Sequence, residues 1–330
     1  MSVRREAIVV VGSLNADVVV TVSRFPAPGE TVPGHGFAVF PGGKGANQAC
    51  AAGRLGGRVS MVGRVGRDAY GEMLARSLAS SGVEVAHVSA DERAPTGTAV
   101  ITVDASGQNH IVVVAGANGA CTPVAIESAR NLLSSAGFVL LQLEIPIETV
   151  AAAARLGRES GAVVLLDPAP ARDLPPDVLR SVDYITPNES ELAALVGAPP
   201  GSTFTVREAA EAARAVRDLG PRNVLVKLGA LGALLVTGDR EHFCPAPQVD
   251  VVDTTAAGDA FNGAFAVALA RGSAPSDAAA FATAAASCSV TRAGAQPSMP
   301  TDDEVVQVMR TALSRQREPS ESKPRSPTVR

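Results

Sequence analysis

Short apolar segments of strand character alternate with longer helical segments along most of the chain, and this alternation restricts the fold more than any other feature. Ile8-Val-Val-Val11 is a continuous apolar run that ends at Gly12, as a strand buried on both faces does. Repeated strand–helix units predict a parallel sheet with helices on both faces. We therefore expect an α/β fold with a doubly wound, mostly parallel sheet. The other expected strands are 59–65, 138–143, 163–167, 184–186, 223–228, 231–237 and 241–244, and the expected helices are 48–55, 70–80, 147–158, 189–196, 206–219, 258–271, 275–291 and 302–313.

Two β-rich segments do not fit this alternation. Residues 17–39 combine a β-like run with a turn-rich break, and residues 96–114 contain a predicted hairpin around Asp104-Ala-Ser-Gly107. We expect these segments to form a small separate sheet that covers the site as a lid. Residues 1–313 then make one domain, and the polar segment 314–330 is predicted to be a disordered tail.

Composition and charge argue against several classes of function. The 330 residues are 46% apolar and 19% charged with a net charge of −4, so we expect no nucleic-acid partner and no membrane surface. Aromatic residues make up only 3%, which removes most stacking platforms for bases. The four cysteines form no C-x-x-C pair and are expected to be buried free thiols. The apolar run at 7–11 is too short for a secretion signal, and no stretch is long enough to cross a bilayer, so we expect a cytoplasmic protein.

The segment Asp253-Thr-Thr-Ala-Ala-Gly-Asp-Ala-Phe-Asn-Gly263 is the strongest indication of chemistry. Its small residues leave several backbone N–H groups free to point in one direction, and an apolar helical run follows at once. Such a nest at a helix N-terminus suits an anion, and phosphate is the usual one. A phosphate repels a neighbouring carboxylate, so Asp259 needs a separate explanation. A role in accepting a proton supplies it.

Polar residues and a glycine also follow several of the expected strands. In open α/β sheets, ligands bind beyond the carboxyl ends of the strands. One polar residue at such a place could be a helix cap or a turn former, but the pattern recurs at five strand ends. The residues are Asn15 and Asp17 after the first strand, Glu144 after 138–143, Asn188 and Glu191 after 184–186, Gly229 after 223–228, and Asp253 and Asp259 after an expected strand at 249–252.

Three shorter motifs each have a structural and a functional interpretation. Gly42-Gly-Lys-Gly-Ala-Asn47 matches neither G-x-x-x-x-G-K-[ST] nor G-x-G-x-x-G, so it is a glycine-rich helix start or a ligand loop in which Asn47 binds hydroxyls. Gly229-Ala-Leu-Gly232 is explained by a β-turn alone. Asn188 and Glu191 could hold a hydrated Mg²⁺, but their spacing favours a helix cap followed by an acidic first turn.

In combination, these motifs resemble the ribokinase family, within the PfkB-type carbohydrate kinases, over about residues 7–312. The resemblance implies a single doubly wound domain with a small β-sheet lid, and a homodimer in which two lids clasp each other. It is carried by residues 11–17, 25–31, 41–49, 142–144, 168–171, 253–263 and 291–298.

The resemblance implies an ATP-dependent kinase that phosphorylates the primary hydroxyl of D-ribose to give D-ribose 5-phosphate. Asp259 would be the general base, and the N–H groups of Ala256, Ala257 and Gly258 would form an anion hole for the transferred group. The implied sugar contacts are Asn15, Asp17, Gly43, Lys44, Gly45, Ala46, Asn47 and Glu144, together with Asp259. The implied ATP contacts are Asn188, Lys227, Leu228, Gly229, Ala230, Leu231, Gly232 and Thr283, with Gly258 and Asp259 beside the phosphates.

The resemblance also implies two cations, and it has two departures. Mg²⁺ would bridge the phosphates, with Glu191 acting mostly through water. K⁺ would order the loop that carries the nest. Lys227 stands where the family often has threonine, and Thr283 stands where histidine or asparagine is common, which leaves the nucleotide preference open. The residues at the K⁺ positions are Asp253, Thr255, Ser289, Arg292, Gly294 and Ser298.

Three other functions compete with this one. A sister kinase could act on another furanose, a keto-sugar or a nucleoside, and the lid side chains that would decide this cannot be placed from sequence. A sugar-sensing protein without catalysis would have lost Asp259 or the glycines around it, and both are present. A dinucleotide-dependent dehydrogenase would need G-x-G-x-x-G after the first strand, which residues 12–17 do not supply.

Overall fold

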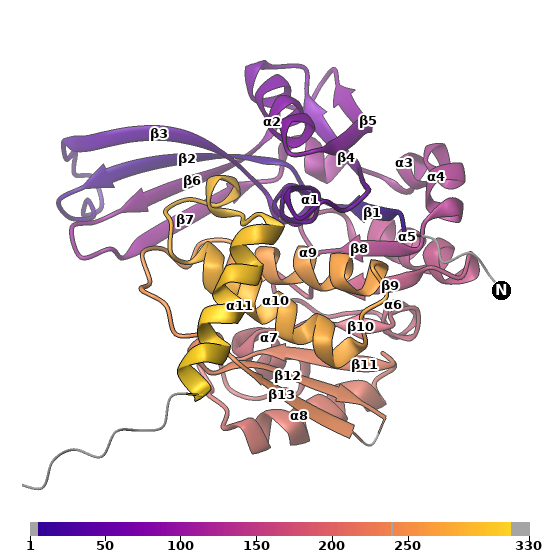
Figure 1. Ribbon diagram of the computed structural model, residues 1–330. Coiled ribbons are helices and arrows are strands. Elements are labelled where there is room, and N and C mark those ends of the chain that lie inside the picture. Colours follow the sequence, from indigo (N-terminus) through magenta and orange to yellow (C-terminus); the bar gives the residue numbers. More distant parts are fainter. Residues whose placement is uncertain (1–5, 239, 318–330) are drawn as a thin grey trace, which may run out of the picture.

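The computed structural model describes residues 6–238 and 240–317, and in this part of the chain the strands form two sheets (Figure 1). The strands of the larger sheet are β1 (Ile8–Val11), β4 (Val59–Gly66), β5 (Val83–Asp91), β8 (Phe138–Leu141), β9 (Val163–Leu166), β10 (Tyr184–Ile185), β11 (Asn223–Lys227), β12 (Gly232–Thr237) and β13 (Arg240–Pro245). Their order is β13-β12-β11-β10-β9-β8-β1-β4-β5, and only β12 pairs with its neighbours in antiparallel fashion. The expected α/β fold with a doubly wound, mostly parallel sheet is confirmed.

Helices cover both faces of this sheet. One face carries α1 (Lys44–Arg54), α2 (Ala69–Ser80), α9 (Ala257–Ala270), α10 (Pro275–Ser289) and α11 (Asp302–Arg317). The opposite face carries α3 (Pro123–Ser128), α4 (Arg130–Ser135), α5 (Ile147–Glu159), α6 (Pro176–Arg180), α7 (Glu189–Leu195) and α8 (Val206–Asp218). In β1, Ile8 and Val10 pack into the first core, whereas Val9 and Val11 pack into the second. Burial on both faces explains why this strand is a continuous apolar run.

A glycine contact sets how closely α9 approaches α1. A Cβ atom on Gly263 would lie 2.7 Å from the carbonyl oxygen of Gln48 and 2.8 Å from the Cβ atom of Ala51. Because glycine has no side chain, the two helices can pack at this short separation. Their N-terminal turns therefore lie side by side, which places Asp259 next to Asn47.

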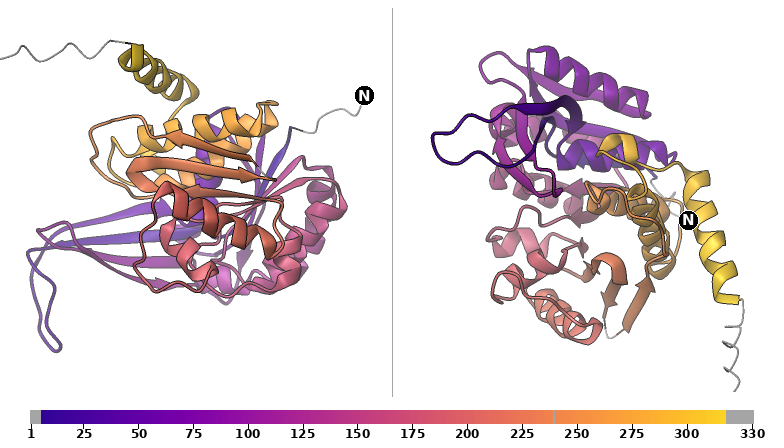
Figure 2. Two further views of the ribbon diagram at one scale, coloured as in Figure 1. Left: turned by 90° about the horizontal axis from the view of Figure 1, so that it is seen from below. Right: turned by 90° about the vertical axis from the view of Figure 1, so that its left-hand side faces the viewer.

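The smaller sheet is the expected lid. It consists of β2 (Asn15–Val22), β3 (Gly34–Gly42), β6 (Gly97–Val103) and β7 (Asn109–Val114), in the order β3-β2-β6-β7. Figure 2 shows that it projects well beyond the helices and the larger sheet. Side chains alternate across its plane, so Ile111 and Val113 face the cavity described below, while Val112 and Val114 belong to the opposite face.

Two expectations about the C-terminal half need correction. Residues 249–252 do not form a strand. This segment connects β13 to α9, and Val252 donates its N–H to the carbonyl of Val290 instead of pairing with a sheet. Val251 and Val252 are 63% and 65% exposed, so their apolar side chains mark an exposed loop and not a buried strand.

The predicted end of the domain at residue 313 is also too early. Helix α11 continues to Arg317, and the Ser314 hydroxyl donates to the carbonyl of Thr311 within it. Residues 318–330 of the predicted tail lie outside the described residues.

Two expectations from composition can be compared with the structure. All four cysteines are buried and free, as expected. Among the described helices, none combines the length and the hydropathy needed to cross a bilayer.

Candidate active site

A cavity of about 900 Å³ lies beyond the carboxyl ends of β1, β8, β9 and β11, between the lid and the N-terminus of α9. This is the edge of the sheet at which the sequence pattern predicts a site. Gly45 and Ala46 lie behind the cavity wall against the end of β1, Leu228 packs in the core, and Leu231 is exposed. The predicted residues that do line the cavity are Asn15, Asp17, Gly43, Lys44, Asn47, Glu144, Asn188, Glu191, Lys227, Gly229, Ala230, Gly232, Thr255, Ala256, Ala257, Gly258, Asp259 and Thr283.

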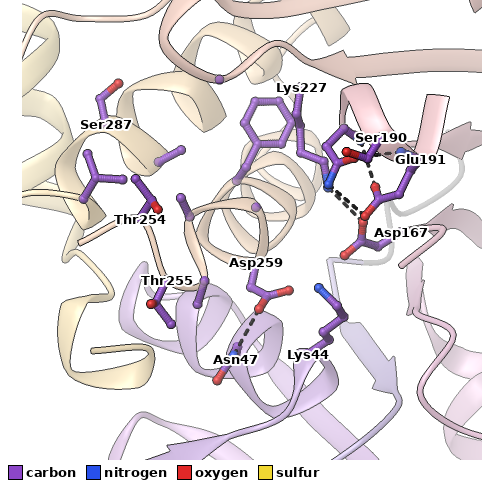
Figure 3. A pocket seen from close by; sticks show the side chains of 18 of the residues that line it. Lys44, Asn47, Asp167, Ser190, Glu191, Lys227, Thr254, Thr255, Asp259 and Ser287 are labelled. Atoms are coloured by element: carbon purple, nitrogen blue, oxygen red, sulfur yellow. Dashed lines mark hydrogen bonds and ion pairs between the residues drawn. The ribbon is translucent and has the colours of Figure 1, made fainter. Parts of the chain in front are cut away.

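Asp259 lies in the first turn of α9 and points into the cavity (Figure 3). Its carboxylate accepts hydrogen bonds from Nδ2 of Asn47 at 3.0 Å and from Nε2 of Gln48 at 3.1 Å, and only 4% of the residue is exposed. Burial raises the pKa of Asp259, and the nearby positive charge of Lys44 opposes that rise. A carboxylate with a raised pKa is a better proton acceptor than an ordinary one, which suits a general base.

The backbone before Asp259 has the form of an anion hole. Ala256 is the N-cap of α9 and has φ of 58°, a left-handed conformation that costs a residue with a side chain on the order of 1 kcal/mol. Ala257 makes a long N–H bond of 3.3 Å to the carbonyl of Thr254. Within the described part of the chain, the N–H groups of Ala256 and Gly258 have no hydrogen-bond acceptor. These two groups can therefore bind an anion at the helix N-terminus.

The lid end of the cavity carries the side chains expected to bind a sugar. Glu144 accepts hydrogen bonds from the Ser13 hydroxyl and, at 3.0 Å, from the backbone N–H of Lys44, so the segment after β1 and the start of α1 together fix its position. Burial raises the pKa of Asp17 to about 7, and the negative charge of Glu144 adds to this effect. Burial alone would lower the pKa of Lys44, but the surrounding carboxylates, with Asp259 contributing most, raise it above its ordinary value. Carboxylates, amides and an amine are thus arranged around one space, as polyol recognition requires.

Asn118 takes part in this region and was not identified from the sequence. It lies in the 3₁₀ turn η1 (Gly116–Ala120) and is 1% exposed. Its Oδ1 accepts from the N–H of Leu14 at 2.9 Å, while its Nδ2 donates to the carbonyl of Leu14 and, at 2.7 Å, to Oδ1 of Asn15. Asn118 therefore fixes the orientation of the Asn15 amide, so that Nδ2 of Asn15 remains to donate to a ligand.

The opposite end of the cavity carries Asn188 and Glu191. They form a capping box at the start of α7, in which Oδ1 of Asn188 accepts from the N–H of Glu191 and the Glu191 carboxylate accepts from the N–H of Asn188. The simpler explanation of their spacing is therefore realised in the structure. Glu191 also lines the cavity, and each carboxylate oxygen keeps a lone pair for a metal-bound water. These residues thus fit a hydrated Mg²⁺ held by the phosphates of a ligand.

Lys227 and Asp167 form an ion pair at the same end of the cavity, and the sequence had not pointed to Asp167. Nζ of Lys227 lies 2.8 Å from Oδ1 of Asp167, at the ends of β11 and β9 (Figure 3). The second oxygen of Asp167 accepts from Nε2 of Gln48 at 2.9 Å. Asp167 follows a strand just as Glu144 does, so the same strand-end pattern could have identified it.

Comparisons with known proteins agree with this geometry. A family model described as "pfkB family carbohydrate kinase" matches residues 5–302. The chain belongs to this family. A ribokinase of Bacillus subtilis is 41% identical over 302 residues, which cover 92% of this chain and 99% of that protein. A deoxyribokinase of Salmonella typhi is 39% identical over 260 residues, which cover 78% of this chain and 84% of that protein.

Comparison with a solved structure supports the same family assignment. The ribokinase of Arabidopsis thaliana, complexed with ribose and ATP, has a TM-score of 0.87 and 38% identity, and the match covers 92% of this chain and 99% of that one. The family and the fold expected from the sequence motifs are therefore confirmed.

The six residues at the expected K⁺ positions of this PfkB kinase lie in two neighbouring segments. Asp253 and Thr255 precede α9, and the other four lie between Ser289, the last residue of α10, and Ser298 in the 3₁₀ turn η3 (Gln296–Ser298). Oδ1 of Asp253 accepts from the N–H of Thr255 at 2.9 Å, and Oδ2 accepts from the N–H of Gly294 at 2.8 Å. Burial alone would raise the pKa of Asp253, but these hydrogen bonds lower it below its ordinary value, so the carboxylate stays ionised. Arg292 pairs with Glu304 at 2.6 Å and donates to the carbonyl of Ser298 at 3.1 Å. The ionised carboxylate keeps a lone pair on each oxygen, so it can serve as an oxygen ligand of a hard cation.

Proposed function

We propose that this protein transfers the γ-phosphoryl group of ATP to the primary hydroxyl of D-ribose and so makes D-ribose 5-phosphate. The observation that carries the proposal is the placement of Asp259. Its buried carboxylate is fixed by two amide donors and lies directly after two free backbone N–H groups. The carboxylate of Asp259 can thus accept a proton next to the backbone N–H groups that can stabilise negative charge on the phosphoryl group.

The residues of the chain divide the work of the reaction. Asp259 takes the proton from the primary hydroxyl, which makes the oxygen a better nucleophile. The N–H groups of Ala256 and Gly258 bind the oxygens of the phosphoryl group during transfer. The capping box of α7 lines the proposed nucleotide end of the cavity, together with Thr283 of α10. The other lining residues at this end are Lys227, Gly229, Ala230 and Gly232. Because the phosphoryl group needs little covalent help, most of the acceleration comes from holding both substrates in line.

The polar residues at the lid end support a sugar as the acceptor. Asn15, Asp17, Lys44 and Glu144 offer donors and acceptors from β2, α1 and the end of β8. A site that binds hydroxyls in this way rejects a sugar that lacks one, because a buried polar group is then left unpaired. The alternative is a sister kinase that acts on another furanose, a keto-sugar or a nucleoside. The similarity to a deoxyribokinase makes 2-deoxyribose the first competitor to test.

Two cations belong to the proposal. Glu191 and Asn188 would hold Mg²⁺ through water, and the ion would supply positive charge that neutralises the phosphates. K⁺ would be held by Asp253 and its neighbouring carbonyls. It would order the loop that carries Ala256 and Gly258, away from the sugar. The support is the ionised Asp253, which already links the two segments through Thr255 and Gly294.

A second copy of the chain is the proposed partner of the lid. Val112 and Val114 are 64% and 52% exposed and belong to the face of the lid that points away from the cavity. Val100 pairs with Val112 on the neighbouring strand and is also exposed. An apolar sheet face of this kind is rare on a monomer and is usually covered. A homodimer through two lids would cover it.

Asp259→Asn tests the proposed function. The variant keeps the shape of the side chain but cannot accept a proton, so turnover should fall by at least about a hundredfold. Ribose affinity, measured by calorimetry, should stay within about threefold. The assay is coupled ADP release across ribose, 2-deoxyribose, other pentoses, hexoses and nucleosides, and Asp173→Asn, at an exposed residue, is the matched control. Near-normal turnover of Asp259→Asn would remove Asp259 from its role, and an inactive wild-type protein on all sugars would refute the proposed function.

A further inference from the structure

The ion pair between Lys227 and Asp167 is unusual because it lines the cavity and is nevertheless buried. The two side chains are 13% and 2% exposed, so the pair is almost entirely withdrawn from water. A buried charge of this kind must be paired to stay ionised. The resemblance to the ribokinase family leads to threonine at position 227 and thus to no charge there. Lys227 therefore places a positive charge on the phosphate side of the site, and Asp167 pairs with it.

The pair is joined to the proposed general base through one amide. Nε2 of Gln48 donates both to Oδ2 of Asp167 at 2.9 Å and to Oδ1 of Asp259 at 3.1 Å. Oε1 of Gln48 accepts from Nε2 of Gln142 at 2.7 Å, so the amide has one orientation. The negative charge of Asp167 also raises the pKa of Asp259. A change at Asp167 or Lys227 should thus alter the hydrogen bonding and the pKa of Asp259.

The amine of Lys227 lies within reach of the anion hole. A Cβ atom placed on Gly258 would be 3.4 Å from Nζ of Lys227, and this is the nearest contact that such an atom would make. Gly258 carries one of the two free N–H groups. The ammonium group donates one bond to Asp167 and has two further hydrogens. Nζ therefore lies beside the residue whose N–H would bind an anion, on a side chain whose long stem allows small adjustments.

We propose that Lys227 is a catalytic residue of this chain, which donates to an oxygen of the phosphoryl group in transit while Asp167 holds its amine in place. This inference rests on the proposed kinase function. The phosphoryl group passes from the nucleotide to the sugar oxygen, the hydroxyl proton passes to Asp259, and Lys227 gains and loses no proton. Its contribution is a fixed positive charge where negative charge develops, in surroundings where water screens it poorly. Asp167 is a positioning residue, because it acts on the phosphoryl group only through the amine.

A purely structural pair would behave differently, and this difference gives the test. Lys227→Met should lower kcat on the order of a hundredfold, the scale for the loss of one transition-state donor. It also leaves Asp167 unpaired, so a neutralising role could give the same loss. The double variant Asp167→Asn with Lys227→Thr removes both charges together. If Lys227 contacts the phosphoryl group, the double variant stays within about threefold of Lys227→Met. If it recovers to within about threefold of the wild-type protein, Lys227 only neutralises Asp167 and the inference fails.

Binding measurements separate this role from a loss of folding. Ribose affinity and ADP affinity should change by less than about threefold in Lys227→Met. Binding of ADP with aluminium fluoride, which occupies the place of the transferred group, should weaken in proportion to kcat. Unchanged affinity for the aluminium fluoride complex would also overturn the inference. The wild-type protein is assayed first, and an inactive wild-type protein would refute the proposed function. If the wild-type protein is active, normal turnover of Lys227→Met would refute this inference alone.

Discussion

Replacing Asp17 by asparagine should make the protein more stable and at the same time a weaker sugar binder. Asp17 lies on the cavity side of β2, where burial and the charges of Glu144 and Asp259 all disfavour its ionised form. The carboxylate therefore opposes folding when no ligand is bound, and we infer that it serves to bind the sugar. The asparagine side chain has nearly the same shape but carries no charge.

The size of the effect follows from the pKa of Asp17. That pKa rises from 3.8 to about 7 on folding, so the folded protein binds the proton more tightly than the unfolded chain does. Between these two values the unfolding free energy falls as the pH rises, by about 1.4 kcal/mol for each pH unit. The full loss is roughly 4 kcal/mol above pH 7, and partial exposure to water reduces it to roughly 2 to 4 kcal/mol. The variant has no such slope, so its advantage is absent near pH 4 and complete near pH 8.

Urea unfolding of both proteins at pH 4.5, 6 and 8, with sugar absent, measures this difference. Asp173→Asn serves as the control, because Asp173 is exposed and does not line the cavity. Ribose binding at pH 8 should be at least about tenfold weaker in Asp17→Asn, since a charged acceptor is lost. A stability difference that stays the same from pH 4.5 to pH 8 would show that the carboxylate is not destabilised by its surroundings, and the reasoning would be refuted.

Four further outcomes are expected. Asn118→Ala should raise the KM for the sugar about tenfold and leave the KM for ATP unchanged, because the Asn15 amide loses its fixed orientation; equal changes in both would argue against this role. Gly263→Ala should lower the unfolding free energy by about 1 to 3 kcal/mol in a denaturant titration, since its Cβ atom would collide with Gln48, and unchanged stability would contradict the described packing. Replacement of K⁺ by a large organic cation should lower turnover in the ADP-release assay, and indifference would argue against the proposed ion site. Val112→Glu combined with Val114→Glu should convert a dimer into a monomer in sedimentation experiments, and an unchanged mass would place the interface elsewhere.

The sheet and most of its helices could be predicted from the sequence, because burial on both faces leaves a strong pattern. Strands such as β1 and β8 are uninterrupted apolar runs, and the helices that cover them are long enough to show their own periodicity. The segment 249–252 also contains three valines, but Asp250 interrupts them and the segment lacks a neighbouring strand to pair with. Composition reports that a segment can form a strand, whereas pairing depends on distant parts of the chain. The end of α11 was misplaced for a related reason, since helix ends depend weakly on side-chain type.

The candidate site could be predicted where a backbone conformation requires special residues. The nest before Asp259 needs small residues, so it leaves a recognisable segment, and the structure places its free N–H groups beside the carboxylate. Asn118 and Asp167 were missed because their importance comes from what they touch. Asn118 is separated by about a hundred residues from the Asn15 amide that it orients, and Asp167 by 60 residues from its partner Lys227. Such pairs follow from the way the chain folds back on itself and leave no local pattern.

The first strand of the lid begins at residues that are proposed to bind the sugar. Asn15 is the first residue of β2, and it pairs with Gly42 at the end of β3 and with Gly97 at the start of β6. A swing of this sheet away from the body must therefore carry Asn15 and Asp17 with it. Opening of the pocket and loss of affinity for the sugar are consequently coupled. The lid cannot move away while Asn15 and Asp17 keep their proposed contacts with the sugar. A small molecule that binds under the lid and holds it open should therefore release the sugar without occupying the positions of the sugar hydroxyls.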